Sequence, residues 1–208
     1  MGHQLTAIVA LFFITVVTCD ECDYKKFTPD HTGCISRNPN CDILDNQVTD
    51  DDKNMILELH NRYREKVAIG KETFWPERGG LPTASNMLEM EWDDELATVA
   101  QRRAETCEFK YDCEDCLKVD RFGVGQNLYR SWISESSSKD LWERMMKTFY
   151  NEVKNFNKEY VSSFKFQADY GRFSQLVWAD TWKVGCGKVV YKDGKWDKTL
   201  VSCNYGPR

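Results

Sequence analysis

Apolar residues recur every three to four positions in three stretches of the chain, and this spacing predicts three amphipathic helices. They cover residues 48–70, 91–107 and 139–157. Thr49 or an adjacent aspartate can cap the first helix, and Gly70 ends it. The inward faces are expected to carry Ile56, Leu59, Tyr63 and Val67; Leu96, Val99, Ala100 and Cys107; and Trp142, Met145, Phe149, Val153 and Phe156.

Two apolar runs near the end of the chain, residues 182–191 and 198–205, have the composition of strands. Asp193-Gly194 lies between them and suits a tight hairpin turn, which would place Cys186 and Cys203 on facing arms. Residues 122–132 predict a further short strand. Helices followed by a helix and a hairpin indicate an α+β domain.

The first nineteen residues have the pattern of a signal peptide. Leu5 to Val17 is apolar or small and too short to span a bilayer, and we expect cleavage before Asp20. No later stretch is apolar enough for a membrane span. The sequence thus divides into a signal peptide (1–19), an irregular cysteine-containing arm (20–50) and a single domain (51–208), and predicts a secreted protein.

Eight cysteines remain if Cys19 leaves with the signal peptide, and an even number in an exported chain predicts disulfides. They are Cys22, Cys34, Cys41, Cys107, Cys113, Cys116, Cys186 and Cys203. Cys113-x-x-Cys116 also has the spacing of a zinc site, but a second such pair is missing from the sequence. We therefore favour disulfides over zinc.

Composition narrows the choice of partners. The net charge is −5 and 29% of residues are charged, which predicts neither a nucleic-acid partner nor an anionic lipid surface. Asp50–Asp52 is expected to start a helix, since the glycine and terminal glutamate of a calcium loop are missing. Trp92, Trp142 and Trp178 are expected in the core.

Four ordered motifs resemble the CAP superfamily of cysteine-rich secretory, antigen-five and pathogenesis-related proteins: "HNRYR" (60–64), "GQNL" (125–128), "GRFSQLVW" (171–178) and "LVSCNYGP" (200–207). The arthropod venom and salivary allergen branch is the most similar. The resemblance implies a single three-layer α-β-α sandwich, the CAP or SCP domain, with a cystine-pinned N-terminal arm.

The same resemblance implies how the cysteines pair. It implies Cys186–Cys203 in the hairpin, Cys41–Cys107 between the arm and the second helix, and Cys22–Cys34 within the arm. Insect relatives join a cysteine near position 113 to the arm. Here that arm partner is missing unless Cys19 is retained, so a local Cys113–Cys116 bond is our hypothesis.

CAP domains characteristically bring two histidines and two acids together in a cleft, which holds a divalent metal in some members. The resemblance places His60, Gln126, Glu152 and Arg172 at these four positions. A guanidinium cannot ligate a metal. We therefore expect no metal and no cofactor, with Arg172 paired instead to Glu152.

His60, Glu152 and Ser174 are weak candidates for a catalytic triad. No oxyanion motif surrounds Ser174, and a structural hydrogen-bond network of His60, Ser174 and Gln175 is the simpler interpretation.

The leading prediction is a secreted, monomeric, non-enzymatic venom or salivary allergen-like protein with an unidentified host or prey target. The alternative is a protein that binds a small hydrophobic ligand, a sterol or a fatty acid, and a serine-type protease is less favoured.

Overall fold

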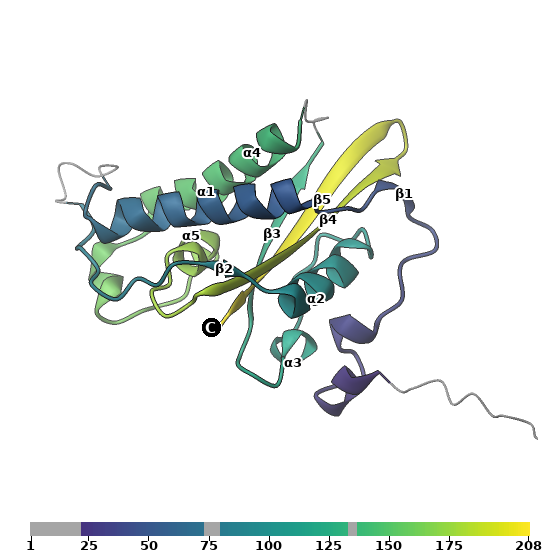
Figure 1. Cartoon of the computed structure of the whole chain (residues 1–208), viewed down its shortest axis with the longest axis horizontal. Helices are drawn as coiled ribbons and strands as arrows, with labels where there is room; N and C mark the ends of the chain where they lie inside the picture. Colours follow the sequence, from purple (N-terminus) through teal and green to yellow (C-terminus); the bar gives the residue numbers. More distant parts are fainter. Residues whose placement is uncertain (1–21, 73–79, 133–136) are drawn as a thin grey trace, which may run out of the picture.

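A mixed sheet lies at the centre of the computed structural model, which describes residues 22–72, 80–132 and 137–208 (Figure 1). The expected signal peptide and Cys19 lie outside these residues. Within the described part the sheet has five strands in the order β1-β4-β5-β3, with β2 beside the start of β4. Their bounds are β1 Asp42–Asp45, β2 Glu91–Trp92, β3 Gly125–Ser131, β4 Lys183–Asp193 and β5 Trp196–Gly206.

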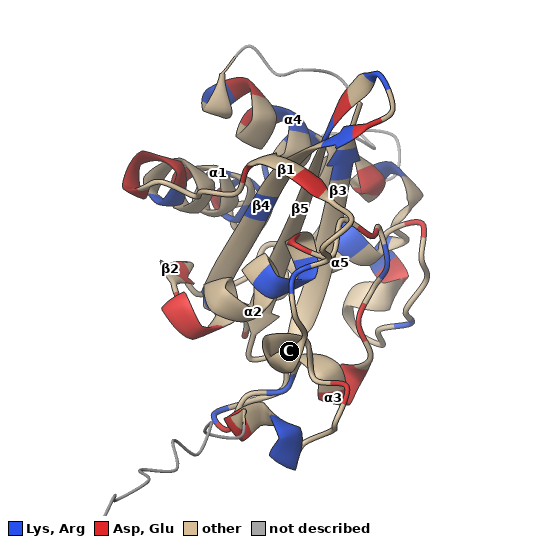
Figure 2. Ribbon diagram, turned by 90° about the vertical axis from the view of Figure 1, so that its right-hand side faces the viewer, with Lys and Arg blue, Asp and Glu red and all other residues tan. Residues whose placement is uncertain are grey.

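The hairpin predicted from the sequence is β4–β5. Its strands are antiparallel, the turn includes Gly194 with a positive φ of 60°, and Cys186 pairs in register with Cys203. Strand β3 runs antiparallel to β5 and forms one edge of the sheet (Figure 2). The predictions of the hairpin and of a strand within 122–132 are confirmed.

The arm is not wholly irregular as expected, because β1 joins the opposite edge of the sheet. It pairs antiparallel with β4, from Asp42 opposite Lys192 to Asp45 opposite Val190. Three of its four residues are exposed, so the strand lacks the apolar alternation that would mark it in the sequence. Its pairing with β4, rather than local propensity, makes this segment a strand.

Helices cover both faces of the sheet, which confirms the three-layer sandwich (Figure 1). Helices α1 (Asp50–Ala68) and α4 (Ser138–Tyr150) pack together on one face, and α2 (Asp94–Ala104) lies on the other. The shorter helices are α3 Glu114–Leu117 and α5 Gly171–Leu176, with 3-10 turns η1 Asp23–Lys26, η2 Thr32–Cys34, η4 Asn151–Asn155 and η5 Lys158–Val161.

Helix α1 begins where the sequence predicts, at a capping box formed by Thr49 and Asp52. The Asp52 carboxylate also accepts a 2.7 Å hydrogen bond from the indole of Trp142, which ties the start of α1 to α4. Asp50–Asp52 is therefore a helix start. The third predicted helix is shorter than expected, since α4 ends at Tyr150 and continues as the tighter turn η4, which carries Glu152.

Helix α2 rests directly on β4 because two glycines leave room for it. A Cβ atom at Gly185 would lie 2.1 Å from the Ala97 amide nitrogen, and one at Gly187 would lie 2.3 Å from Gln101 Cα. Any side chain at these positions would push the helix off the sheet.

The structure contains the four expected disulfides, Cys22–Cys34, Cys41–Cys107, Cys113–Cys116 and Cys186–Cys203. The arm is also held by His31, whose Nε2 bonds to the Lys118 carbonyl at 2.9 Å and whose Nδ1 accepts from Gly33. Among the described residues, no helix has the length and apolar character needed to cross a membrane.

Candidate functional site

A cavity of about 740 Å³ lies along the outer edge of β3. Three consecutive residues of this edge, Gly125 to Asn127, form one side, and the segments around α3 and α5 form the others. The lining is rich in aromatic rings, namely Tyr111, Phe164, Phe166 and Trp178. Volumes of this size are typical of small-molecule sites.

Arg172, at the start of α5, lines this cavity, and its side chain is held by an ion pair with Glu152. The Arg172 Nε donates to Glu152 Oε1 at 2.5 Å, which confirms the predicted ion pair. The second carboxylate oxygen accepts the backbone N–H groups of Arg172 and Phe173 at 2.8 and 3.0 Å. Glu152 therefore caps α5 and fixes the Arg172 side chain at once, while itself remaining 9% exposed.

The Nη1 and Nη2 atoms of Arg172 have no hydrogen-bond partner within the described part of the chain. The side chain is 30% exposed, and its charge is close enough to Tyr111 to act on the phenol. Burial raises the pKa of Tyr111, and the Arg172 charge partly offsets that rise. The cavity thus contains donor atoms beside an aromatic ring.

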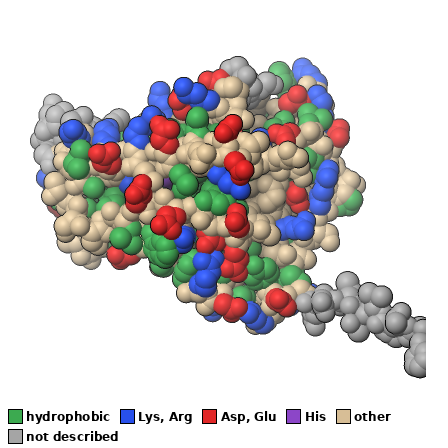
Figure 3. All heavy atoms as spheres, viewed as in Figure 1, with side chains coloured by type: hydrophobic (Ala, Val, Ile, Leu, Met, Phe, Trp, Pro, Cys, Tyr) green, Lys and Arg blue, Asp and Glu red, His purple; other side chains and the backbone are tan. Residues whose placement is uncertain are grey.

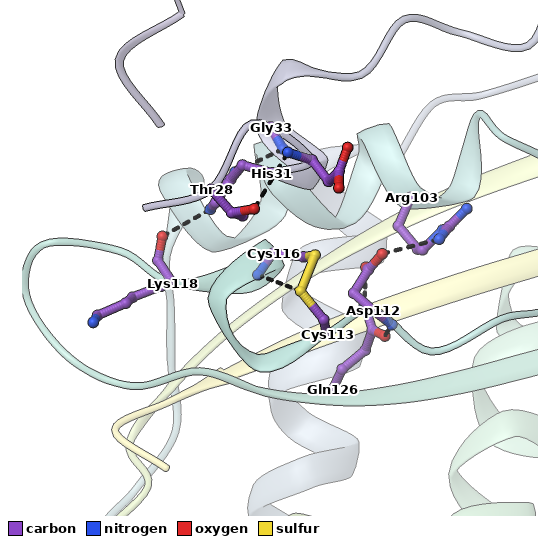
Figure 4. Close-up of a disulfide and its surroundings, with 10 residues drawn as sticks. Thr28, His31, Gly33, Arg103, Asp112, Cys113, Cys116, Lys118 and Gln126 are labelled. Atoms are coloured by element: carbon purple, nitrogen blue, oxygen red, sulfur yellow. Dashed lines mark hydrogen bonds and ion pairs between the residues drawn. A yellow bond between two sulfur atoms is a disulfide. The ribbon is translucent and has the colours of Figure 1, made fainter. Parts of the chain in front are cut away.

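Gln126 also lines the cavity, and its amide bonds to Asp112 and, at 3.3 Å each, to the side chains of Ser202 and Asn204 on β5. It donates to Asp112 Oδ2 at 2.8 Å and accepts the Asp112 backbone N–H at 3.0 Å. Arg103 donates to the other Asp112 oxygen at 2.9 Å. Gln126 therefore anchors the segment before α3 to the sheet edge (Figure 4).

Of the four family positions, Gln126 and Arg172 line this cavity, and Glu152 and His60 do not. His60 lies in the core. It is 0% exposed. Its Nδ1 lies 2.7 Å from the Ile56 carbonyl oxygen, and its Nε2 lies 3.0 Å from the Tyr205 hydroxyl. Burial, with a smaller effect of the Arg64 charge, lowers the pKa of His60 to about 4. The helical phase of His60 points it into the core, a depth that the motif alone does not reveal.

The three triad candidates each have other partners. His60 bonds to Ile56 and Tyr205, Glu152 pairs with Arg172, and Ser174 Oγ donates to the Gly171 carbonyl at 2.9 Å. Because none of these bonds joins two members of the trio, the arrangement lacks the nucleophile–base–acid chain that a triad requires. The suggested network of His60, Ser174 and Gln175 is not formed either, since Gln175 bonds to Thr181.

A divalent metal does not fit these residues. Arg172 brings a fixed positive charge and no lone pair, and Glu152 uses both oxygens on Arg172 and Phe173. Within residues 22–72, 80–132 and 137–208, no group of three or more His, Cys, Asp or Glu side chains could hold a metal ion.

Sequence reasoning missed the aromatic wall. Phe164 and Phe166 are 39% and 71% exposed at the cavity, in a stretch whose apolar residues follow no helical or strand period. Trp178, expected in the core, is only partly buried and lines the cavity. The available signal was the density of aromatic residues between 156 and 178.

Arg64 was also missed, although it belongs to the same motif as His60. It is 2% exposed, and its guanidinium donates to five backbone carbonyls, those of Leu88, Leu176, Trp178, Ala179 and Thr181. Arg64 thereby holds the segment that follows α5 in place behind the cavity.

Comparison with known proteins settles the family. The cysteine-rich secretory protein family, CAP, matches residues 57–205. The chain belongs to the CAP family. It is 46% identical over 88% of its length to a CRISP/Allergen/PR-1 protein of Trittame loki, and 40% identical over 98% to venom allergen 5 of Tityus serrulatus.

The chain spans about half the length of these two CAP relatives, 45% and 49% respectively. Among solved structures, that of NaASP2 with Zn²⁺ has a TM-score of 0.62 and 25% identity, covering 82% of this chain and 84% of that one. This match agrees with the CAP fold described above.

Proposed function

We propose that this chain is a secreted, non-catalytic CAP protein of the venom-allergen kind, and that the cavity beside β3 binds a small amphipathic molecule outside the cell. The observation that carries the proposal is the cavity itself, of about 740 Å³, with an aromatic wall and the free donor atoms of Arg172. The venom allergens among its relatives and its four disulfides support an extracellular, oxidising setting.

The geometry favours a ligand with an apolar or planar body and at least one acceptor oxygen. Phe164, Phe166 and Trp178 offer ring surfaces to the body. The Nη atoms of Arg172 can donate to a carboxylate, sulfonate or carbonyl oxygen, and the Glu152 pair keeps the guanidinium in place before the ligand arrives. Capture of such a molecule is the action that we propose toward a host or prey.

We do not propose that this chain binds nucleic acid or zinc, or that it is a protease. Over the face in Figure 3, acidic and basic side chains are interspersed, an arrangement that does not favour nucleic acid. The zinc named with NaASP2 is not transferred to this chain, because Arg172 occupies the cavity with a charge that repels cations. His60, Glu152 and Ser174 have separate partners, so no observed contact supports the protease alternative.

Fluorescence titration with anilinonaphthalene sulfonate, an aromatic anion, tests the site. We expect one saturable site in the wild type, with affinity about ten-fold lower in Arg172→Gln because a charged hydrogen bond is lost. Phe166→Ala should also weaken binding, and its exposure makes it safe for folding. Arg62→Gln, an exposed change on α1, should leave affinity unchanged. Absence of saturation, or wild-type affinity in both Arg172→Gln and Phe166→Ala, would refute the site.

A further inference from the structure

The Cys113–Cys116 disulfide differs from the other three in position and surroundings (Figure 4). Its two cysteines are only 3 positions apart in the sequence. The cysteines of Cys41–Cys107 are 66 positions apart, and those of Cys186–Cys203 are 17 apart. Of the eight cysteines in these bonds, Cys113 alone is exposed; Cys116, Cys22, Cys34 and Cys107 are partly exposed, and Cys41, Cys186 and Cys203 are buried. A bond over so short a segment restricts the unfolded chain least, so it adds least to the stability of the fold.

Both ends of this segment are fixed by contacts that do not involve sulfur. On one side, Asp112 is held by Gln126 and by Arg103. On the other side, Leu117 is 4% exposed and packs in the cluster with Leu96 and Val99. The segment can therefore keep its place when the bond is open.

We propose that Cys113–Cys116 is a thiol–disulfide exchange site, opened by an extracellular protein dithiol and closed again by the disulfide form of that protein, while the domain stays folded. This proposal does not rest on ligand binding in the cavity, although Glu114 and Leu117 of the same segment line it. It requires three features that the contacts above supply: access to sulfur, a fold that does not need the bond, and a fixed position for the two cysteines to rejoin.

The exchange is a two-electron step with the partner dithiol as reductant. Its thiolate attacks the exposed Cys113 sulfur, and Cys116 leaves as a thiolate that takes up a proton. The partner's second thiol then attacks its own sulfur in the mixed disulfide, releasing Cys113. The chain gains two electrons and two protons, and the partner becomes a disulfide. The Cys116 backbone N–H, 3.1 Å from Cys113 Sγ, donates to the sulfur that is released last.

Charge around the bond indicates which partner surface fits. Glu114 and Asp115, the two residues between the cysteines, are both exposed, and the Arg208 guanidinium lies 3.7 Å from Glu114. Asp112 is paired with Arg103. The two exposed carboxylates repel an anionic attacking group, so we infer a dithiol on a neutral or basic protein surface.

Limited reduction of the full chain, followed by differential alkylation and peptide mapping, tests how readily a reductant reaches the Cys113–Cys116 bond. At low reductant, we expect Cys113 and Cys116 to be labelled at least ten-fold faster than the other six cysteines, with an unchanged near-ultraviolet circular dichroism spectrum. A cationic thiol, cysteamine, should open the bond faster than the anionic mercaptopropionate at equal thiolate concentration. Equal labelling of all pairs, or loss of the spectrum as Cys113 and Cys116 are labelled, would overturn the proposal.

A trapping experiment tests exchange with a protein. A thioredoxin whose resolving cysteine is replaced by serine should form a mixed disulfide with the wild type. The double variant Cys113→Ser/Cys116→Ser should fold, bind anilinonaphthalene sulfonate as the wild type does, and give no adduct. Absence of an adduct with the wild type, or an equal adduct with the double variant, contradicts the exchange site and leaves the ligand-binding proposal untouched.

Discussion

At the scale of single residues, two buried groups show how the CAP motif "HNRYR" works in this chain. Arg64 keeps its positive charge in the core without a carboxylate from the described residues in contact, because five backbone carbonyls surround the guanidinium. Burial lowers its pKa to about 10, which still leaves it charged at neutral pH. His60, one turn earlier, stays neutral in the same interior. Through Arg64, the motif therefore holds the segment after α5 that carries Trp178, a residue of the cavity wall.

Replacing Arg64 should destabilise the fold strongly. Arg64→Met leaves several buried carbonyls without a donor, and we expect a loss of at least about 3 kcal/mol in the free energy of unfolding. Urea unfolding measures it, with Arg62→Met as the exposed control, expected within about 0.5 kcal/mol of wild type. Similar losses in the two variants would show that the carbonyl network contributes little.

His60 should make stability depend on pH in a defined window. Its pKa is about 4 in the folded chain and about 6.5 when unfolded. The unfolded chain thus binds the proton first, and the stabilisation present above pH 6.5 is lost as pH falls toward 4. The loss should reach roughly 2–3 kcal/mol at pH 4.5. Urea unfolding at pH 7 and 4.5 should show this extra loss in the wild type relative to His60→Gln. Parallel pH profiles would contradict it.

At the scale of elements, the close contact of α2 with β4 sets the spacing of one layer. Gly185 and Gly187 leave no room for a side chain beneath Ala97 and Gln101. On the opposite face, Glu152 performs a similar organising role by capping α5 across twenty residues of sequence. Both contacts join elements that are distant in the chain.

Gly187→Ala should weaken this layer. Its Cβ would lie 2.3 Å from Gln101 Cα, so α2 must shift, and we expect a loss of about 2–3 kcal/mol. Gly123→Ala is the matched control, since no atom lies within 4 Å of its Cβ position. Thermal unfolding followed by circular dichroism should separate the two variants. An unshifted transition in Gly187→Ala would refute the spacing argument.

At the scale of the whole molecule, the sequence pattern predicted the helices and the hairpin better than the site, and the CAP resemblance supplied the three layers. Long helices and the hairpin carry a regular apolar period, and the turn at Asp193-Gly194 is local. Strand β1 and helix α5 were not anticipated, because pairing with β4 and capping by Glu152 come from distant segments. The Arg172–Glu152 pair followed from the CAP resemblance, which placed both residues at one cleft, together with the chemistry of a guanidinium beside a carboxylate. The burial of His60 was not predicted, since a motif does not determine how deeply its residues are buried. The aromatic wall of the cavity was not predicted either, since the path of an aperiodic loop cannot be read from its sequence.

Our central proposal concerns Arg172, which occupies a position where the CAP resemblance leads us to expect a metal ligand. We propose that Arg172 instead donates hydrogen bonds to an organic molecule in the cavity beside β3. Native mass spectrometry of the protein purified from its source tests this most directly. We predict one organic molecule per chain, released on denaturation, without the mass of a metal ion. A mass that includes zinc or another divalent metal, or a chain that carries no ligand and takes up no amphipathic anion, would contradict it.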